Sequence, residues 1–151
     1  MSGLEKLDDL DLKLLIEYVK DARQSSRHIS KKLNVAASTI IERTKRLERK
    51  GIIKGYSAVV DYDKAGYELT AVVQVTISNK LPEVERTIAK MPQVVSIYDV
   101  TGQTDAIIIA KFKTRKELSD FAKKLLSTRY VERTTTHLAL NIIKESLGPA
   151  I

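Results

Sequence analysis

Basic side chains that could bind a polyanion are concentrated in one short part of the sequence. The 151 residues include 26 Lys and Arg against 19 Asp and Glu, a net charge of +7. Residues 27–54 alone hold 9 basic and 2 acidic residues, which is also a net charge of +7. Such a local excess of cations suits nucleic acid, although a solvated basic helix face would have the same composition. The spacing of these residues therefore has to distinguish the two interpretations.

Side chains for other kinds of chemistry are scarce. The chain has no cysteine, which excludes disulfides, iron–sulfur clusters and cysteine-based zinc sites. His28 and His137 are the only histidines, and nothing in the sequence brings them together. There is no nucleophile–base set, no glycine-rich phosphate loop and no metal-ligand spacing. We therefore expect no enzyme, no catalytic residue, no metal site and no cofactor.

The chain also lacks the patterns of a membrane or exported protein. Its longest apolar run, residues 106–110, is far shorter than the roughly 20 residues needed to cross a bilayer. The start, Met1 to Lys6, has no apolar signal-peptide segment. We expect a cytoplasmic protein that binds no membrane.

Three predicted helices position the basic residues. Apolar residues recur at helical spacing over residues 7–18, 26–33 and 36–50. Asn34, which tolerates the left-handed conformation, lies in the turn between the second and third helices, and Gly51 follows the third. A short helix, a tight turn and another helix form the helix-turn-helix motif of DNA-binding proteins. The expected N-caps are Asp8, Ser26 and, later in the chain, Thr114 in a capping box with Glu117.

The third predicted helix has the residue order of a recognition helix. At 100° per residue, Ile40, Thr44 and Leu47 share one side and pack inward. On the opposite side small polar residues come first and cations follow, so that the helix start can meet base edges and the cations can hold phosphates. Arg43 lies at the side of the helix, where either a structural role or a DNA contact is possible. The predicted base-edge contacts are Ala37, Ser38, Thr39, Ile41 and Glu42, and the predicted phosphate contacts are Lys45, Arg46 and Arg49, with Arg27, Lys31 and Lys32 from the second helix nearby.

The remainder of the chain alternates between the period of strands and that of helices. Residues 52–60 are β-prone and predict a linking strand. Further strands are predicted over residues 69–77, 94–100, 106–112 and 133–143, and helices over residues 82–91 and 115–126. The order β-α-β-β-α-β is that of a ferredoxin-like unit, with four antiparallel strands and two helices on one face. We therefore predict an α+β fold with a helix-turn-helix domain (1–54), a hinge strand and linker (55–66) and a ferredoxin-like βαββαβ domain (67–151).

The predicted sheet is apolar on both faces. Its two helices cover one face, so the other face should be polar if it meets water. Residues 106–110 are apolar on both sides, and the last predicted strand also has apolar residues on both sides. The simplest second cover is another copy of the same sheet. We expect a homodimer through this domain, because enclosure within one chain needs a further helix that the sequence does not contain.

Motifs in both parts of the chain match those of one known family. The most specific segment runs from Arg46 to Tyr56 and is paired with the later turn Thr101-Gly102-x-x-Asp105. Further matching residues are Leu7-Asp8, Asp11, Leu14-Leu15, Arg23, Ile29, Leu33, Val35, Arg43 and Val94-Val95. On these residues the chain resembles the Lrp/AsnC family, the feast/famine regulators of bacteria and archaea. It departs at Asn34, where the family usually has glycine, and at Ala36, where a serine usually caps the recognition helix.

The resemblance implies a sequence-specific DNA-binding transcriptional regulator. Family members bind double-stranded DNA as dimers, often assembled into octamers or other higher multimers. They bind amino acids at the interface between dimers and act as repressors or activators. Because Ala36 cannot cap the recognition helix with its side chain as a serine would, it lowers the stability of that helix by about 1 kcal/mol.

The turn between Thr101 and Asp105 is the predicted effector site. Gly102 lets the backbone approach a ligand, and neighbouring N–H groups can face a carboxylate. Asp99 or Asp105 can accept an α-ammonium. Without any ligand, residues 101–105 would simply form a tight turn and residues 134–136 would be a plain strand start. The predicted effector contacts are Asp99, Thr101, Gly102, Gln103, Thr104, Asp105, Thr134, Thr135 and Thr136.

Two carboxylates beside one turn exceed the single anion that one ammonium needs. The surplus leads to the hypothesis of a basic effector such as lysine or arginine. The alternative function is an architectural DNA-packing protein of the same fold without an effector, because multimers can wrap DNA. RNA binding has less support, because the predicted strands show no aromatic pair placed for base stacking.

Overall fold

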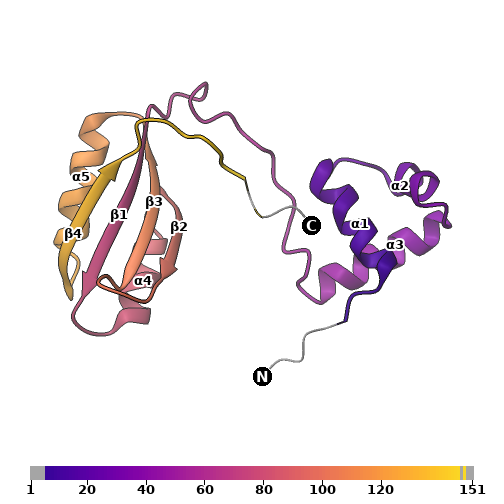
Figure 1. Ribbon diagram of the computed structural model, residues 1–151, viewed down its shortest axis with the longest axis horizontal. Coiled ribbons are helices and arrows are strands. Elements are labelled where there is room, and N and C mark those ends of the chain that lie inside the picture. Colours follow the sequence, from indigo (N-terminus) through magenta and orange to yellow (C-terminus); the bar gives the residue numbers. More distant parts are fainter. Residues whose placement is uncertain (1–5, 147, 149–151) are drawn as a thin grey trace. The chain divides into compact units, whose positions relative to one another are not determined.

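The computed structural model describes residues 6–146 and 148, which form two compact units (Figure 1). One unit contains the N-terminal helices and extends to Val59, and the other spans Val60–Glu145. The outermost residues of the two predicted domains, 1–5, 147 and 149–151, lie outside the described part. No described helix is long and apolar enough to cross a membrane.

The N-terminal unit is built from α1 (Asp9–Lys20), α2 (Ser26–Leu33) and α3 (Ala37–Arg49) around a small core. Asp8 caps α1 as expected: the Asp11 N–H donates to Asp8 Oδ1 at 2.9 Å, and the Asp8 N–H donates to Asp11 Oδ2 at 3.3 Å. This reciprocal capping box fixes where α1 begins. The fully buried side chains of the core are Leu14, Ile29, Ile40 and Leu47.

Local backbone geometry sets the ends of α2 and α3. Asn34 adopts φ 54° and ψ 47° and closes α2, which confirms the predicted turn. Gly51 adopts φ 67°, its N–H donates to Glu48 O, and the Ile52 N–H donates to Leu47 O. These two bonds form a Schellman motif. The predicted N-cap of α2 was wrong by one position, because Ser25 has the extended backbone and accepts the His28 N–H.

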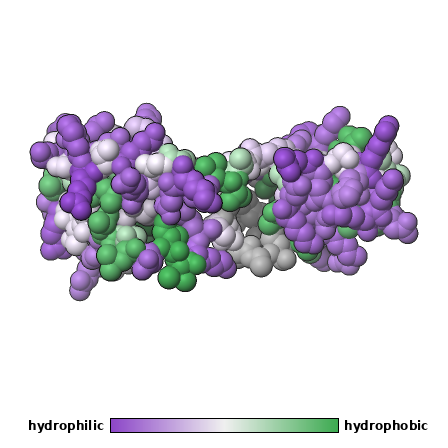
Figure 2. Space-filling view, turned by 90° about the horizontal axis from the view of Figure 1, so that it is seen from above, coloured by the Kyte–Doolittle hydropathy of each residue, from purple (hydrophilic) through white to green (hydrophobic). Residues whose placement is uncertain are grey.

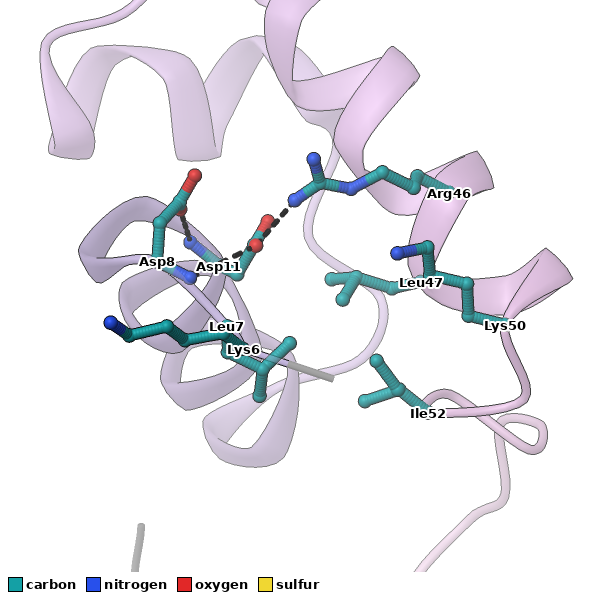
Figure 3. Close-up of a pocket in the computed structure, with 8 residues that line it drawn as sticks. All are labelled: Lys6, Leu7, Asp8, Asp11, Arg46, Leu47, Lys50 and Ile52. Carbon is teal, nitrogen blue, oxygen red and sulfur yellow. Dashed lines mark hydrogen bonds and ion pairs between the residues drawn. The ribbon is translucent and has the colours of Figure 1, made fainter. Parts of the chain in front are cut away.

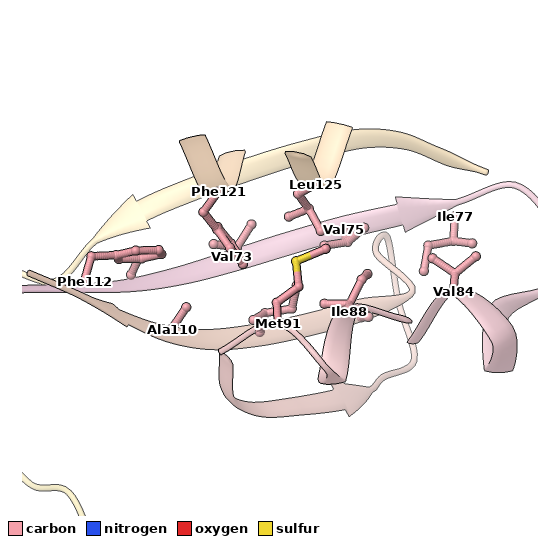
Figure 4. Close-up of a cluster of buried hydrophobic side chains, with 13 residues drawn as sticks. Val73, Val75, Ile77, Val84, Ile88, Met91, Ala110, Phe112, Phe121 and Leu125 are labelled. Atoms are coloured by element: carbon pink, nitrogen blue, oxygen red, sulfur yellow. The ribbon is translucent and has the colours of Figure 1, made fainter. Parts of the chain in front are cut away.

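The second unit is an antiparallel sheet with two helices on one face (Figure 1). Its elements are β1 (Leu69–Ile77), α4 (Leu81–Ala89), β2 (Val94–Asp99), β3 (Ala106–Phe112), α5 (Arg115–Leu126) and β4 (Val131–Leu138), with strand order β2-β3-β1-β4. Both helices place apolar side chains on one face of the sheet, where they meet Val73, Val75 and Phe112 (Figure 4). This arrangement confirms the predicted α+β fold with a ferredoxin-like unit.

Two predicted strands and a second cap also differ from the structure. Residues 52–60 form no strand, because no described strand lies beside them to supply hydrogen bonds, and Val59 is 90% exposed. The last strand ends at Leu138 instead of residue 143, because its partner β1 begins at Leu69 and offers few further groups to pair. Thr114 caps α5, but the Glu117 carboxylate accepts the Lys113 N–H rather than that of Thr114.

The segment before β1 folds back onto the sheet face that lacks helices. Lys111 lies on that face, is 4% exposed and pairs with Glu145 at 3.0 Å. The Tyr62 ring lies 5.4 Å from the Lys111 ammonium and packs edge-on against Tyr67. Residues of both flanking segments therefore cover the part of this face around Lys111.

Candidate nucleic-acid interface and effector site

The side of α3 opposite its buried residues is open to solvent. Ser38, Glu42, Lys45 and Arg49 are all exposed, and Ile41 is 45% exposed. Hydrophilic side chains cover most of the visible surface of the N-terminal unit in the space-filling view (Figure 2). Ala36 forms no side-chain cap at the start of α3. The first backbone N–H groups of α3 thus have no cap side chain to which they can donate a hydrogen bond.

The predicted phosphate-binding cations fall into two groups. Arg27, Lys31 and Lys45 are exposed and form no ion pair with any described residue, and Arg49 makes only a weak contact with Lys45 O on its own helix. Lys32 is also exposed but is paired, because its ammonium donates to Glu17 Oε2 at 2.7 Å and to Gln24 Oε1 at 2.8 Å. Only the first group therefore presents free cations on the outer surface.

Arg46 also lies apart from the exposed cations, because its guanidinium bends back toward α1 (Figure 3). Its Nη2 donates to Asp11 Oδ2, and Arg43 Nη1 donates to Asp11 Oδ1 at 3.1 Å and to Asp8 Oδ2. The hydrogen bond with Arg43 lowers the pKa of Asp8 and raises the pKa of Arg43. The structure assigns Arg43 the structural role that the sequence left open.

The contribution of Asp11 goes beyond the predicted placement at the start of α1. This carboxylate is 1% exposed and links α1 to α3 through two arginines. A signal for the pairing is present in the sequence, because the two aspartates at 8 and 11 and the two arginines at 43 and 46 have the same spacing.

The first residues of the linker are attached to α3. The Tyr56 hydroxyl donates to Glu48 Oε1 at 2.8 Å, and its ring packs edge-on against Tyr18 at 5.8 Å. The Tyr18 hydroxyl in turn bonds to Thr44 Oγ1 at 3.0 Å. The chain is therefore held to the helical unit up to Tyr56.

The predicted effector turn is fastened to the neighbouring strand β1. Thr104 Oγ1 donates to Val75 O at 2.7 Å, and Asp105 Oδ2 accepts the Ile77 N–H at 2.7 Å. Gly102 has φ 124°, a conformation that favours glycine. Asp105 thus has a clear structural role, whereas Asp99 is exposed.

Two of the remaining predicted effector residues, Asp99 and Thr134, lie in one row across the sheet. Asp99 is opposite Ala106, Ala106 opposite Val75, and Val75 opposite Thr134. Three strand spacings separate Asp99 from Thr134, about 14 Å, which is too far for both to contact one small amino acid. Thr135 points to the other face from its neighbours. One chain alone therefore does not bring all predicted contacts together.

Glu85 on α4 is an acidic residue that sequence reasoning missed. Its Oε1 is buried and has no hydrogen-bond partner among the described residues. Burial raises the pKa of Glu85, and the negative charge of Asp99 adds to this increase. Glu85 and Asp99 therefore form a pair of interacting carboxylates on the α4 side of the predicted effector turn.

The fold and these two sites define a class of protein: regulators that join a helix-turn-helix to a ligand-binding domain. Residues 7–54 match the family model for winged helix-turn-helix DNA-binding, and residues 70–149 match that for the Lrp/AsnC ligand binding domain. The chain belongs to the Lrp/AsnC family of transcriptional regulators, which are not enzymes.

Similar proteins come from archaea and bacteria. The chain is 48% identical to an HTH-type transcriptional regulator of Pyrococcus furiosus, over 93% of this chain and 95% of the relative. It is 36% identical to the HTH-type transcriptional regulator FL11 of the same species, over 93% of both chains. A Neisseria meningitidis transcriptional regulator solved as a complex with L-Met has a TM-score of 0.86 and 27% identity, covering 94% of this chain and 95% of its own.

Proposed function

We propose that the chain reads operator DNA with the exposed side of α3. The observation that carries this proposal is that α3 exposes a set of side chains on the side opposite its buried residues Ile40 and Leu47. Base edges meet Ala37, Ser38, Thr39, Ile41 and Glu42, and phosphates meet Lys45 and Arg49, with Arg27 and Lys31 beside them. The proposal leaves out Lys32 and Arg46, which were also predicted from the sequence, because each forms a hydrogen bond with an acidic residue of α1.

Salt titration of DNA binding tests this placement. We expect Lys45→Ala and Arg49→Ala each to weaken binding to any duplex and to reduce the slope of log K against log salt by about 0.9 per lost phosphate contact. Lys90→Ala, which removes an exposed lysine of the second unit, is the matched control. Wild-type affinity and slope in both α3 variants would exclude this face as the DNA contact.

A second copy of the sheet covers the face without helices in the proposed assembly. Val72, Ile107 and Ile109 on that face are only partly buried in one chain, and Tyr98 is 58% exposed. Apolar patches are visible on the surface of this unit (Figure 2). A homodimer formed there presents two α3 helices to two half-sites, and octamers or other multimers arise from further contacts between dimers.

An amino acid bound at the 101–105 turn is the proposed effector. The Lrp/AsnC ligand-binding domain and the L-Met complex of the similar Neisseria protein support an amino acid ligand. Backbone N–H groups around Gly102 face the ligand carboxylate, and Asp99 accepts the ammonium. The second carboxylate of Glu85 favours a basic side chain, lysine or arginine.

Calorimetric titration with the twenty amino acids tests the effector proposal. We expect lysine or arginine to bind tightest, and Asp99→Asn to weaken that binding while leaving DNA affinity without effector unchanged. Tight binding of aliphatic amino acids alone would exclude a basic effector. An architectural DNA-packing function would replace regulation if no amino acid changed the multimer size or the DNA footprint.

A further inference from the structure

An ion cluster of four side chains, Asp8, Asp11, Arg43 and Arg46, joins α1 to the proposed recognition helix α3. Figure 3 shows three of them, Asp8, Asp11 and Arg46. Asp11 is 1% exposed and receives one arginine on each carboxylate oxygen. A buried carboxylate is costly unless it is paired, so the two arginines are required where they lie. The cluster thereby fixes α3 against α1 at two points one helical turn apart.

We propose that Arg43 and Arg46 are positioning residues that orient α3 through Asp11 and do not contact DNA phosphates. This inference rests on the proposed function, because it needs the opposite side of α3 to enter the DNA groove. A recognition surface discriminates bases only when its side chains are held within roughly 10–20° of the productive orientation. The cluster supplies that restraint on the rotation of α3.

The surroundings of Arg46 argue against a phosphate contact. Its side chain is 36% exposed, and its Nε is buried without a hydrogen-bond partner among the described residues. Movement of this guanidinium to a phosphate would leave Asp11 buried with Arg43 as its one remaining ion-pair partner among the described residues. Arg49 lies three residues later on the same helix, is exposed, and has no such restraint. The two arginines therefore provide a matched comparison.

The experiment compares Arg46→Gln with Arg49→Gln in the full chain. The DNA affinity of each variant is measured at several salt concentrations on a duplex of random sequence. The measurement is repeated on the duplex that the wild type selects from a random library. We expect Arg49→Gln to reduce the salt slope by about 0.9. We expect Arg46→Gln to keep the wild-type slope but to lose about tenfold in preference for the selected duplex, comparable to the loss of one well-placed base contact.

Asp11→Asn extends the test to the acidic side of the cluster. We expect the same loss of preference as in Arg46→Gln, and no further loss when the two changes are combined. Circular dichroism checks folding, and if Asp11→Asn does not fold, the Arg46→Gln comparison decides alone.

Three results separate the possible failures. A slope reduced in Arg46→Gln as much as in Arg49→Gln would overturn the inference and make Arg46 a phosphate contact. If Arg46→Gln melted at a lower temperature but bound both duplexes with wild-type affinity, the inference would also be overturned, because the cluster would then serve stability alone. An unchanged slope in Arg49→Gln would contradict the proposed DNA face itself, and the inference would fall with it.

Discussion

Glu17 on α1 is a buried acid that pairs with Lys32, one of the DNA contacts predicted from the sequence. Its side chain is 10% exposed and accepts hydrogen bonds from Lys32 at 2.7 Å and from Lys20 at 3.1 Å. These contacts, Lys32 first, lower the pKa of Glu17 from 4.5 to about 2. Lys32 therefore contributes to the stability of the helical unit through this ion pair.

The lowered pKa predicts how stability depends on acid. The pKa of Glu17 is lower in the folded protein than its ordinary value of 4.5, so the ionised side chain stabilises the folded state at pH values above 4.5. This stabilisation is lost as the pH falls toward about 2. We expect Glu17→Gln to melt at a lower temperature than wild type at neutral pH, and to lose less on acidification. Glu83→Gln, which changes a 69% exposed carboxylate, is the control in thermal melts. Parallel pH curves for wild type and Glu17→Gln would contradict the assignment.

At the scale of elements, Gly51 determines where α3 stops. Its φ of 67° is unfavourable for residues with a Cβ, although no atom lies within 4 Å of an added Cβ. We expect Gly51→Ala to lower the free energy of unfolding by about 1–2 kcal/mol through backbone strain alone. Gly55→Ala, with equal space but no positive φ, should stay within about 1 kcal/mol of wild type in urea unfolding. Equal stability of the two variants would argue against the Schellman end.

Strands whose own residues alternate in the pattern of a sheet were predictable from the sequence. Strand ends that depend on pairing with a neighbouring strand were not. The strands Leu69–Ile77 and Ala106–Phe112 match their predicted bounds, because alternation and β-branched residues specify a central strand directly. The strand expected over residues 133–143 stops at Leu138, since pairing depends on the start of β1. Ser25 and Ser26 are equivalent caps by type, and only the backbone distinguishes them.

The candidate site was predictable to the level of helix faces. Helical periodicity identified the exposed side of α3 and its buried residues Ile40 and Leu47. It could not show which way a long side chain bends, and Arg46 turns to Asp11, 35 positions away in the sequence. Asp105 posed the same difficulty, because its backbone partner Ile77 belongs to another strand.

At the scale of the whole molecule, the proposed dimer depends on the sheet face around Val72 and Ile109. A charge is tolerated there while the face meets water but is costly once a second copy covers it. We expect Ile109→Asp to raise the dimer dissociation constant at least about 100-fold while the circular dichroism spectrum is kept. Analytical ultracentrifugation measures the change, with Ser119→Asp on the exposed surface of α5 as control. An intact dimer in Ile109→Asp would place the interface elsewhere.

The attachment of Tyr56 to α3 has a consequence for how the two units communicate. Tyr56 is bonded to Glu48, and Tyr62 packs against Lys111 of the sheet. Between these two anchors the chain has only residues 57–61, so the two tyrosine Cα atoms can never be more than about 20 Å apart. In the proposed dimer, this short connection would limit how far apart two half-sites of an operator can lie while both α3 helices stay bound.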